Sequence, residues 1–411
     1  MEENRKDKAE RIYKIVMLVI LTAFITFMVT SLSLYTYFTK NPAYTLITGE
    51  NTASKADINS YLDKIKALID KNYLWKDDVK EEDLIDGAIE GYVEGLGDKY
   101  TEYIPATEIQ DFKEDIEGSF VGIGVYMIAD EDTQKIVVYY PIPDSPAEKA
   151  GIKSGDIIVS VDGKEYAFED FNIIADNIKG KEGTKVKLVI ERDGKQMEFE
   201  IERAKIETNP ITSKILENNI GYIKLPSFDT DSSKKFKEKV DELISKGAKS
   251  LIVDLRNNGG GIVDEAETIA DYFLDKNKII MTTKNNKNEE EKTETSKKQE
   301  YSMPMVILTN ENSASASEIL TGALKENERA KIIGTKTYGK GVIQTVITLS
   351  DGSGLLKITT AEYFTPNGNA INKKGIEPDI KVELPDTVKS IYSVTEKDDT
   401  QLQKAIEELS K

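Results

Sequence analysis

The sequence predicts an α/β domain built on a mostly parallel sheet with flanking helices. A smaller α+β module, a helical region and one apolar N-terminal helix precede it. From position 219 onward, apolar runs such as SLIVDL alternate with amphipathic runs such as SSKKFKEKVDELISKG, as strands and helices do around a parallel sheet. Between 117 and 205, short alternating runs flank an Asp-Gly turn, which is typical of antiparallel strands. Residues 15–38 are apolar and about long enough to cross a bilayer as one helix.

The composition narrows the classes of function. The 411 residues carry 39% hydrophobic and 31% charged side chains, which is ordinary for globular protein and suggests two or three domains. A formal net charge of −18 argues against nucleic acid as a partner, because an acidic surface repels phosphates. The chain has no cysteine and no histidine, which excludes disulfides, thiol nucleophiles and ordinary zinc sites. We predict no metal and no cofactor, so hydrolytic chemistry would use Ser, Thr, Lys, Tyr, Asp or Glu.

The N-terminal residues predict a location. Residues 1–14 contain several lysines and arginines, whereas only Lys40 closely follows the apolar segment 15–38. This asymmetry predicts a single-pass helix in the cell membrane, with a cytoplasmic N-terminus and the bulk of the chain extracytoplasmic. A cleaved signal peptide is the competing interpretation, but the apolar segment is longer than a typical signal core and no clean small-x-small site follows it.

Changes in composition divide the rest of the chain. We assign 39–54 to a polar linker and 55–116 to a helical region. The α+β module takes 117–205, the α/β domain 206–384 and a C-terminal helical tail 385–411. Within the α/β domain, 284–300 has no apolar side chain, so it is a solvated loop or a flexible hairpin.

The α+β module resembles bacterial PDZ domains. The resemblance is carried by DSPAEKAGIKSGDIIVSVDGKEY at 144–166 and by Gly122, Ile123, Gly124 and Val125. It implies that these four residues receive the C-terminal carboxylate of a peptide. The peptide would add as a strand beginning near Gly124, with a helix at 169–179 as the other wall of the groove.

The stretch DLRNNGGG at 254–261 joins an expected strand to an expected helix. Successive backbone N–H groups at such a junction can form an anion-binding nest. The simpler interpretation is a tight strand-to-helix turn. A phosphate loop fits badly because the Lys-Ser/Thr of a Walker sequence is missing. An oxyanion hole is the remaining functional interpretation.

Three serines stand in SASASE at 313–318, just after an apolar run and just before a helical one. Ser315 and Glu318 have the spacing of a capping box, which would make Ser315 only a helix cap. A serine at such an elbow would also expose its hydroxyl at the carboxyl edge of the sheet. The N–H of Ala316 could then join an oxyanion hole. Position alone leaves both interpretations open.

Lys340 and Gln344 lie in TKTYGKGVIQ at 335–344, with Lys340 between two glycines. A lysine can serve as base to a serine only when neutral, which requires a largely apolar site that lowers its pKa to about 7–8. In an extended chain the two side chains would be roughly 13 Å apart, so contact between them requires a bend at Gly341. A glutamine carbonyl suits the orientation of a neutral amine. An isolated lysine in a turn, however, is more often simply solvated.

Together these stretches resemble the C-terminal processing peptidases, also called carboxyl-terminal or tail-specific proteases, of serine peptidase family S41. The resemblance covers nearly all of 80–384, in the order helical segment, PDZ domain, α/β protease core. It is carried by the motifs GLGDKYTEY, DLRNNGGG, NSASASE and GKGVIQ. The resemblance implies that Ser315 is the nucleophile, Lys340 the base and Gln344 the amide that orients the base. It also implies that the backbone N–H groups of Ala316 and of Gly260 or Gly261 are the oxyanion donors.

The resemblance therefore predicts a membrane-anchored serine endopeptidase that captures exposed C-terminal tails of proteins through its PDZ domain and cleaves them. It also allows a homodimer. Relatives often carry arginine where this chain has Lys179, which leaves an arginine-based coupling of PDZ domain and site in doubt. Two other functions stay open: an inactive PDZ scaffold that binds C-termini, and a different Ser–Lys hydrolase using Ser232 and Lys235. The second fits less well, because TDSSKKFKEKV has the pattern of an exposed helix start.

Overall fold

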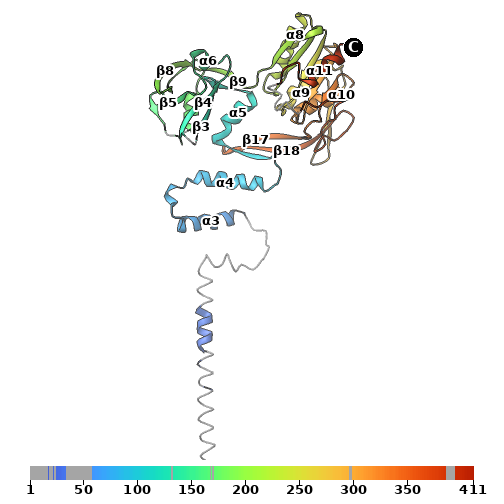
Figure 1. The fold of residues 1–411 in the computed structure, drawn as a ribbon. Helices are drawn as coiled ribbons and strands as arrows, with labels where there is room; N and C mark the ends of the chain where they lie inside the picture. The colour runs from blue at the N-terminus through green and yellow to red at the C-terminus, as the bar shows by residue number, and fades with distance from the viewer. Residues whose placement is uncertain are drawn as a thin grey trace, which may run out of the picture. The chain divides into compact units, whose positions relative to one another are not determined.

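The computed structural model describes residues 17, 22, 25–33, 58–130, 133–166, 168, 171–295, 299–385 and 394–411. It divides into two compact units, Met1–Leu84 and Ile85–Lys411. The first unit contains α3 (Ile58–Asn72), the 3-10 helix η1 (Lys76–Asp78) and the start of α4 (Glu81–Glu94). Figure 1 labels α3 and α4. Among the described residues, no helix has both the length and the apolar character that a membrane span requires. Most of the segment 15–38, predicted to span a membrane, lies outside the described residues.

The second unit is built on a six-stranded sheet in the order β10-β11-β12-β15-β16-β19. All neighbouring strands are parallel except β10 and β11, in agreement with the predicted mostly parallel sheet. The strands, in chain order, are Thr212–Ile215, Ile220–Lys224, Ser250–Asp254, Met305–Thr309, Lys331–Gly334 and Ile380–Lys381.

Helices pack against both faces of this sheet. The helices α8 (Ser232–Ser245), α9 (Val263–Phe273) and α10 (Ala316–Glu326) share a core with one face, and α11 (Thr400–Leu409) packs on the other (Figure 1). Alternation along β12 explains the two cores, because successive side chains of a strand point to opposite faces. Leu251 and Val253 belong to the first core and Ile252 to the second.

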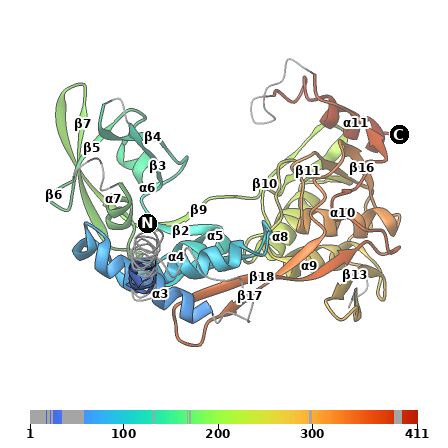
Figure 2. The ribbon, with the colours of Figure 1, turned by 90° about the horizontal axis from the view of Figure 1, so that it is seen from below.

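The second unit contains a second sheet of five strands, in which β17 and β18 form a long hairpin (Figure 2). Its strands are β1 (Glu102–Pro105), β13 (Ile279–Asn285), β14 (Glu290–Glu294), β17 (Val342–Thr348) and β18 (Gly354–Phe364). The β13–β14 pair shows that the charged stretch at 284–300 contains a hairpin. Strand β1 lies inside the region predicted to be helical and pairs with β18. It has four residues and a partner some 250 positions away, so no local pattern indicates it.

The PDZ module forms a separate antiparallel sheet in the order β3-β4-β5-β7-β8, with β6 paired to β5, and a small β2–β9 pair. Strands β2 to β9 are Ser119–Gly122, Val125–Asp130, Lys135–Pro141, Ile157–Val161, Lys164–Glu165, Lys185–Arg192, Lys195–Glu202 and Ala204–Glu207. Its helices are α6 (Pro146–Ala150) and α7 (Phe171–Ile178), and α5 (Ile109–Glu117) precedes it. Short 3-10 turns η2 (Ala106–Glu108) and η4 (Glu217–Asn219) complete the described elements.

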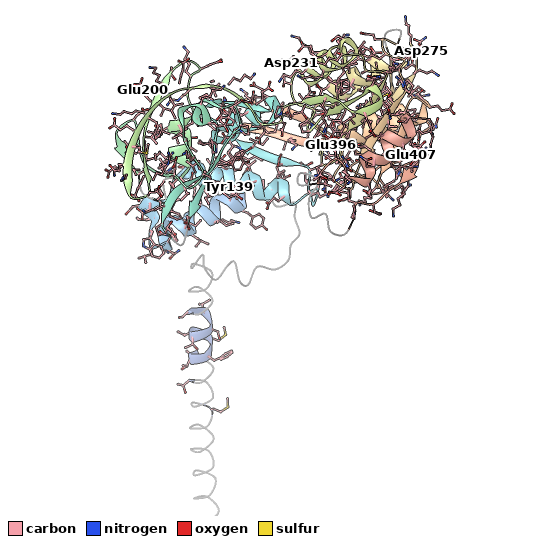
Figure 3. All side chains as sticks on the ribbon, turned by 45° about the horizontal axis from the view of Figure 1, so that its top comes forward. Tyr139, Glu200, Asp231, Asp275, Glu396 and Glu407 are labelled. Atoms are coloured by element: carbon pink, nitrogen blue, oxygen red, sulfur yellow. The ribbon has the colours of Figure 1, made fainter. Side chains whose placement is uncertain are left out.

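The acidic composition is displayed on the surface. The carboxylates labelled in Figure 3, such as Glu200, Asp231 and Glu407, are solvent-exposed. Because each lies on a different element, the negative charge is distributed over the molecule rather than confined to one site. This distribution suits a protein that does not bind phosphate backbones.

Candidate active site

Two loops meet at the carboxyl edge of the central sheet. One follows β12 and contains DLRNNGGG, and the other follows β15 and contains SASASE. They are adjacent because β12 and β15 are parallel neighbours. Ala314 N–H donates to the Asn258 carbonyl (3.0 Å), and Asn257 N–H donates to Asn310 Oδ1 (2.8 Å). The glycine-rich loop and the serine loop therefore form one hydrogen-bonded layer.

The three serines of SASASE have different surroundings. Ser313 Oγ donates to the Leu255 carbonyl (2.8 Å) and Ser317 Oγ to the Asn258 carbonyl (2.9 Å). Both serines are completely buried. Their hydroxyls thus join the serine loop to the glycine-rich loop, which leaves Ser315 as the candidate nucleophile.

Ser315 has an unusual backbone conformation. Its φ is 56° and its ψ is −118°, whereas an ordinary helix cap is extended. A non-glycine residue with such angles is strained, and strain of this kind is found at the nucleophile elbow of hydrolases. Ser315 N–H donates to Glu318 Oε2 (3.0 Å), which is the glutamate half of the predicted capping box. Glu318 N–H donates to the Ser315 carbonyl (2.8 Å), and the Ser315 side chain makes no cap hydrogen bond within the described residues. Ser315 therefore has the position of a helix cap, but capping explains neither its free hydroxyl nor its left-handed φ.

The predicted oxyanion donors lie beside Ser315. A Cβ on Gly260 would be 2.7 Å from Ser315 Cβ and 3.0 Å from Ala316 N, so only glycine permits this approach. Ala316 begins α10, where N–H groups have no partner within the helix. The N–H of Gly260 already donates to Asn258 Oδ1 at 2.8 Å. Within the described part of the chain, the N–H of Gly261 has no such partner, which favours Gly261 as the second donor.

Lys340 lies in the loop between β16 and β17 and is half-buried. Gly341, next to it, passes so close to Asn372 that a Cβ would lie 2.3 Å from the Asn372 backbone nitrogen. Desolvation, assisted by the positive charge of Lys357, lowers the pKa of Lys340 below its usual 10.5, while Asp98 and Glu102 oppose this effect. A lysine that acts as a base requires a lowered pKa, so the shift of Lys340 has the required direction.

In the described part of the chain, no hydrogen bond joins the three predicted catalytic side chains. Lys340 Nζ lies over the Tyr100 ring, 4.8 Å from its centroid. Gln344 is on strand β17 and its Nε2 donates to Thr359 Oγ1 at 3.3 Å. Among the described side chains, neither Ser315 nor Gln344 is hydrogen-bonded to Lys340 Nζ. Residues 342–348 pair with β18 as a strand, with a register shift between Ile343 and Gln344, and this pairing places Gln344 opposite Thr359.

A buried carboxylate connects the two catalytic loops. Glu318 is fully buried, and its Oε2 accepts the N–H groups of Ser315 (3.0 Å) and Lys340 (2.9 Å). Its Oε1 accepts Gly339 N–H (2.8 Å) and the Thr337 hydroxyl (2.6 Å). Burial raises the pKa of Glu318, while these four donors oppose that effect. All four contacts are donors to the carboxyl, as the ionised form requires.

Tyr363 joins the same loops from β18. Its hydroxyl contacts the carbonyl oxygens of Ser315 (3.1 Å) and Lys340. Sequence reasoning missed this residue and gave Glu318 only a capping role, although the capping spacing did single out Glu318. The backbones of Ser315 and Lys340, the candidate nucleophile and the candidate base, are thus both held by Glu318 and Tyr363.

We expect Glu318→Gln to lower kcat by roughly 10- to 100-fold, because one pair of buried donors would face an NH₂ group instead of an oxygen. The measurement is kcat on an unfolded protein substrate. Glu326→Gln, in the same helix, is the matched control, since Glu326 binds Thr365 and Asn369 instead. Equal losses in the two variants would contradict a specific role for Glu318.

Comparisons with known proteins identify the family of the chain. Family models match for "Peptidase family S41" at residues 219–382, "PDZ domain" at 137–192 and "Activating protease CtpB N-terminal domain" at 20–107. The carboxy-terminal processing protease CtpA of Bacillus subtilis is 38% identical over 348 residues, which cover 84% of this chain and 74% of that protein. The chain belongs to the carboxy-terminal processing proteases of peptidase family S41.

Other members of this family are similarly related. A probable CtpA-like serine protease of Staphylococcus aureus (strain N315) is 37% identical over 341 residues, covering 82% of this chain and 67% of that protein. Among solved structures, the photosystem II D1 C-terminal processing protease is 29% identical, with a TM-score of 0.46, and the match covers 79% of this chain and 88% of that one.

In this carboxy-terminal processing protease, a buried ion network supports the glycine-rich loop. Arg256 is 2% exposed and pairs with Asp254 (2.7 Å) and with Asp399 (2.9 Å). Arg256 Nη1 also donates to Gln401 Oε1 at 3.0 Å. Asp399 is the N-cap of α11, so the C-terminal helix is joined to the glycine-rich loop that carries Gly260 and Gly261.

The four predicted PDZ residues run from the last residue of β2, Gly122, to the first residue of β3, Val125. Ile123 is completely buried in the PDZ core, and its carbonyl accepts Ala147 N–H (2.8 Å). The Gly124 carbonyl accepts Ile142 N–H (2.9 Å) and the Ser145 hydroxyl (3.1 Å). Strand β3, which begins at Val125, is the terminal strand of its sheet. A terminal strand is what strand addition by a peptide requires.

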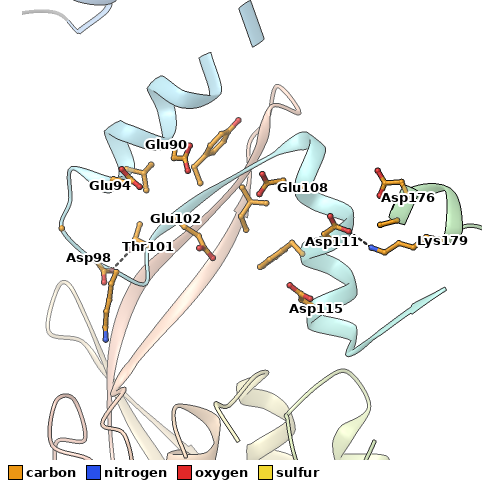
Figure 4. Close-up of a pocket in the computed structure, with 17 residues that line it drawn as sticks. Glu90, Glu94, Asp98, Thr101, Glu102, Glu108, Asp111, Asp115, Asp176 and Lys179 are labelled. Atoms are coloured by element: carbon orange, nitrogen blue, oxygen red, sulfur yellow. Dashed lines mark hydrogen bonds and ion pairs between the residues drawn. The ribbon is translucent and has the colours of Figure 1, made fainter. Parts of the chain in front are cut away.

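A cavity of about 940 Å³ is lined by residues of α4, β1, α5 and α7 and of the turn before β1 (Figure 4). Eight carboxylates line it, against two lysines, Lys99 and Lys179. Asp98 and Glu102, which act on the pKa of Lys340, belong to this lining. These two carboxylates therefore oppose the desolvation that lowers the pKa of Lys340.

Proposed function

We propose that this chain is a serine endopeptidase in which Ser315 is the nucleophile and Lys340 the general base. The observation that carries the proposal is the Glu318 carboxylate, which holds the N–H groups of Ser315 and Lys340 on one oxygen. A purely structural cap would need no such link to a half-buried lysine. The strained φ of Ser315 supports the same assignment.

In the proposed reaction, neutral Lys340 takes the proton of the Ser315 hydroxyl, and Ser315 attacks the peptide carbonyl. The N–H groups of Ala316 and Gly261 or Gly260 hold the oxyanion. Lys340 then protonates the leaving amine, and water hydrolyses the acyl-enzyme. For this reaction the lysine side chain must leave the Tyr100 ring and reach Ser315, and Gln344 must exchange Thr359 for the lysine amine.

The proposal includes the substrate and the location. The PDZ module would take the C-terminal tail of a protein as an added strand along β3, with the carboxylate at Gly122–Val125. Residues 15–38 would anchor the chain in the cell membrane with the catalytic part extracytoplasmic. Self-association of the chain stays a prediction.

The test of the base is the pH dependence of kcat. Because the pKa of Lys340 is lowered from 10.5, activity should be present above the lowered pKa and lost as pH falls through it. We therefore expect an ascending limb with a midpoint below 10.5, measured on an unfolded protein substrate with the full chain. Lys340→Ala should lose this limb. A wild-type profile without an ascending limb would overturn the lysine-base assignment.

A further inference from the structure

A tyrosine from outside the catalytic loops lies against the base. The turn at 98–101, between α4 and β1, presents Tyr100, and Lys340 Nζ lies over its ring with 4.8 Å to the centroid. Tyr100 is half-buried, as Lys340 is. Since Lys340 Nζ makes no hydrogen bond to any described side chain, the ring is its principal partner.

The position of this ring is fixed by hydrogen bonds. Asp98 Oδ1 accepts Tyr100 N–H (3.1 Å), and Asp98 Oδ2 accepts the Thr101 hydroxyl (2.7 Å). Thr101 Oγ1 in turn accepts Thr359 N–H from β18 (3.1 Å). The next residue, Glu102, begins β1 and pairs with Lys357 of β18. The ring is therefore attached to the same strand pair that carries Gln344.

The face of an aromatic ring attracts a cation but has no comparable attraction for a neutral amine. A protonated Lys340 is therefore stabilised at the ring. A neutral Lys340 loses this stabilisation, and only the neutral form can accept the serine proton. The contact thus distinguishes the inactive from the active protonation state of the base.

We propose that Tyr100 is a positioning residue that holds protonated Lys340 away from Ser315 and releases the side chain when it loses its proton. The proposal rests on the proposed role of Lys340 as base. In this proposal, loss of the Lys340 proton and movement of its side chain occur together. In the resting enzyme, protonated Lys340 lies at the Tyr100 ring.

Other charges also face Lys340, and they remain when the ring is changed. Lys357 and Lys99 disfavour the ammonium, whereas Asp98 and Glu102 favour it. Glu318 and the Tyr363 hydroxyl bind the Lys340 backbone rather than its amine. The Tyr338 hydroxyl accepts from Lys99 Nζ at 2.8 Å. Lys99 Nζ also lies over the Tyr100 ring, 4.7 Å from its centroid, so replacing Tyr100 changes the surroundings of Lys99 too, and a control must change Lys99 without changing this ring.

The experiment measures the protonation of Lys340 directly. The full chain carrying Ser315→Ala is treated with acetic anhydride at a series of pH values, and acetylation at Lys340 is quantified by mass spectrometry, because only a neutral amine reacts. Tyr100→Phe keeps the ring face and should keep the wild-type midpoint. Tyr100→Leu keeps an apolar side chain without the ring and should lower the midpoint by about 0.4 to 0.7 pH unit.

Two controls make the result decisive. Tyr338→Leu removes a neighbouring ring that contacts Lys99 (5.1 Å), and it should leave the Lys340 midpoint unchanged. In chains that retain Ser315, the ascending limb of kcat should move with the midpoint in Tyr100→Leu. An unchanged or raised midpoint in Tyr100→Leu would overturn the proposal, because the ring would then only exclude water. If Lys340→Ala cleaves normally, the base assignment fails, while the acetylation midpoint still reports on the ring.

Discussion

Replacing Ser315 by alanine is expected to lower kcat by roughly 10⁴- to 10⁶-fold. The hydroxyl is the only group at this elbow that the proposed mechanism uses to form the acyl-enzyme. Loss of the hydroxyl should leave the fold intact, because the N–H of Ser315, not its side chain, donates to Glu318. The measurement is cleavage of an unfolded protein substrate under single-turnover conditions, together with the urea midpoint of the variant.

Ser317→Ala is the matched control within the same motif. It removes the donor to the Asn258 carbonyl (2.9 Å) and should cost about 1–3 kcal/mol of stability. It should retain most of the cleavage activity, in contrast to Ser315→Ala. Comparable activity in wild type and Ser315→Ala would exclude this serine as nucleophile. Inactivity of wild type towards many unfolded substrates would favour a PDZ scaffold instead.

The sequence predicts the parts of the site that come from neighbouring strands. Strands β12 and β15 end in loops with chemically informative residues, and parallel neighbours place such loops together. The choice of Ser315 among three serines depends on the family resemblance, and the structure adds a physical reason. The hydroxyls of Ser313 and Ser317 donate to carbonyl oxygens of the glycine-rich loop. Of the three serines, only Ser315 has a left-handed φ.

The contacts that position the base are not predictable from local patterns. Tyr100 reaches Lys340 only because the four-residue strand β1 pairs with β18, some 250 positions later. Tyr363 reaches both catalytic loops from that same distant strand. In the described part of the chain, Lys340 and Gln344 do not form the predicted hydrogen bond. Strand pairing places Gln344 opposite Thr359, and the Gln344 side chain donates to Thr359 instead. Long-range strand pairing therefore determines which side chains surround Lys340, and the spacing of residues along the sequence does not predict them.

Replacing Asp399 by alanine should lower the free energy of unfolding by about 3–5 kcal/mol. The change leaves Arg256, itself 2% exposed, with one fewer buried counter-charge. It also removes the N-cap of α11, since Asp399 Oδ1 accepts Leu402 N–H at 3.0 Å. The measurement is urea unfolding of the full chain, with kcat recorded in parallel, because Arg256 stands in the loop that leads to the oxyanion glycines.

Asp399→Asn separates the two contributions, because asparagine caps a helix as well as aspartate does but carries no charge. If the ion pair dominates, the asparagine variant should lose more than half of the stability that the alanine variant loses. If capping dominates, it should be close to wild type. Lys331→Ala removes an exposed lysine of β16 that pairs with Glu408 of α11 (3.1 Å). It should cost less than about 1 kcal/mol, because Glu408 keeps Lys404 and Lys411 as partners. A normal kcat in a folded Asp399→Ala variant would show that the C-terminal helix stabilises the domain without positioning the oxyanion loop.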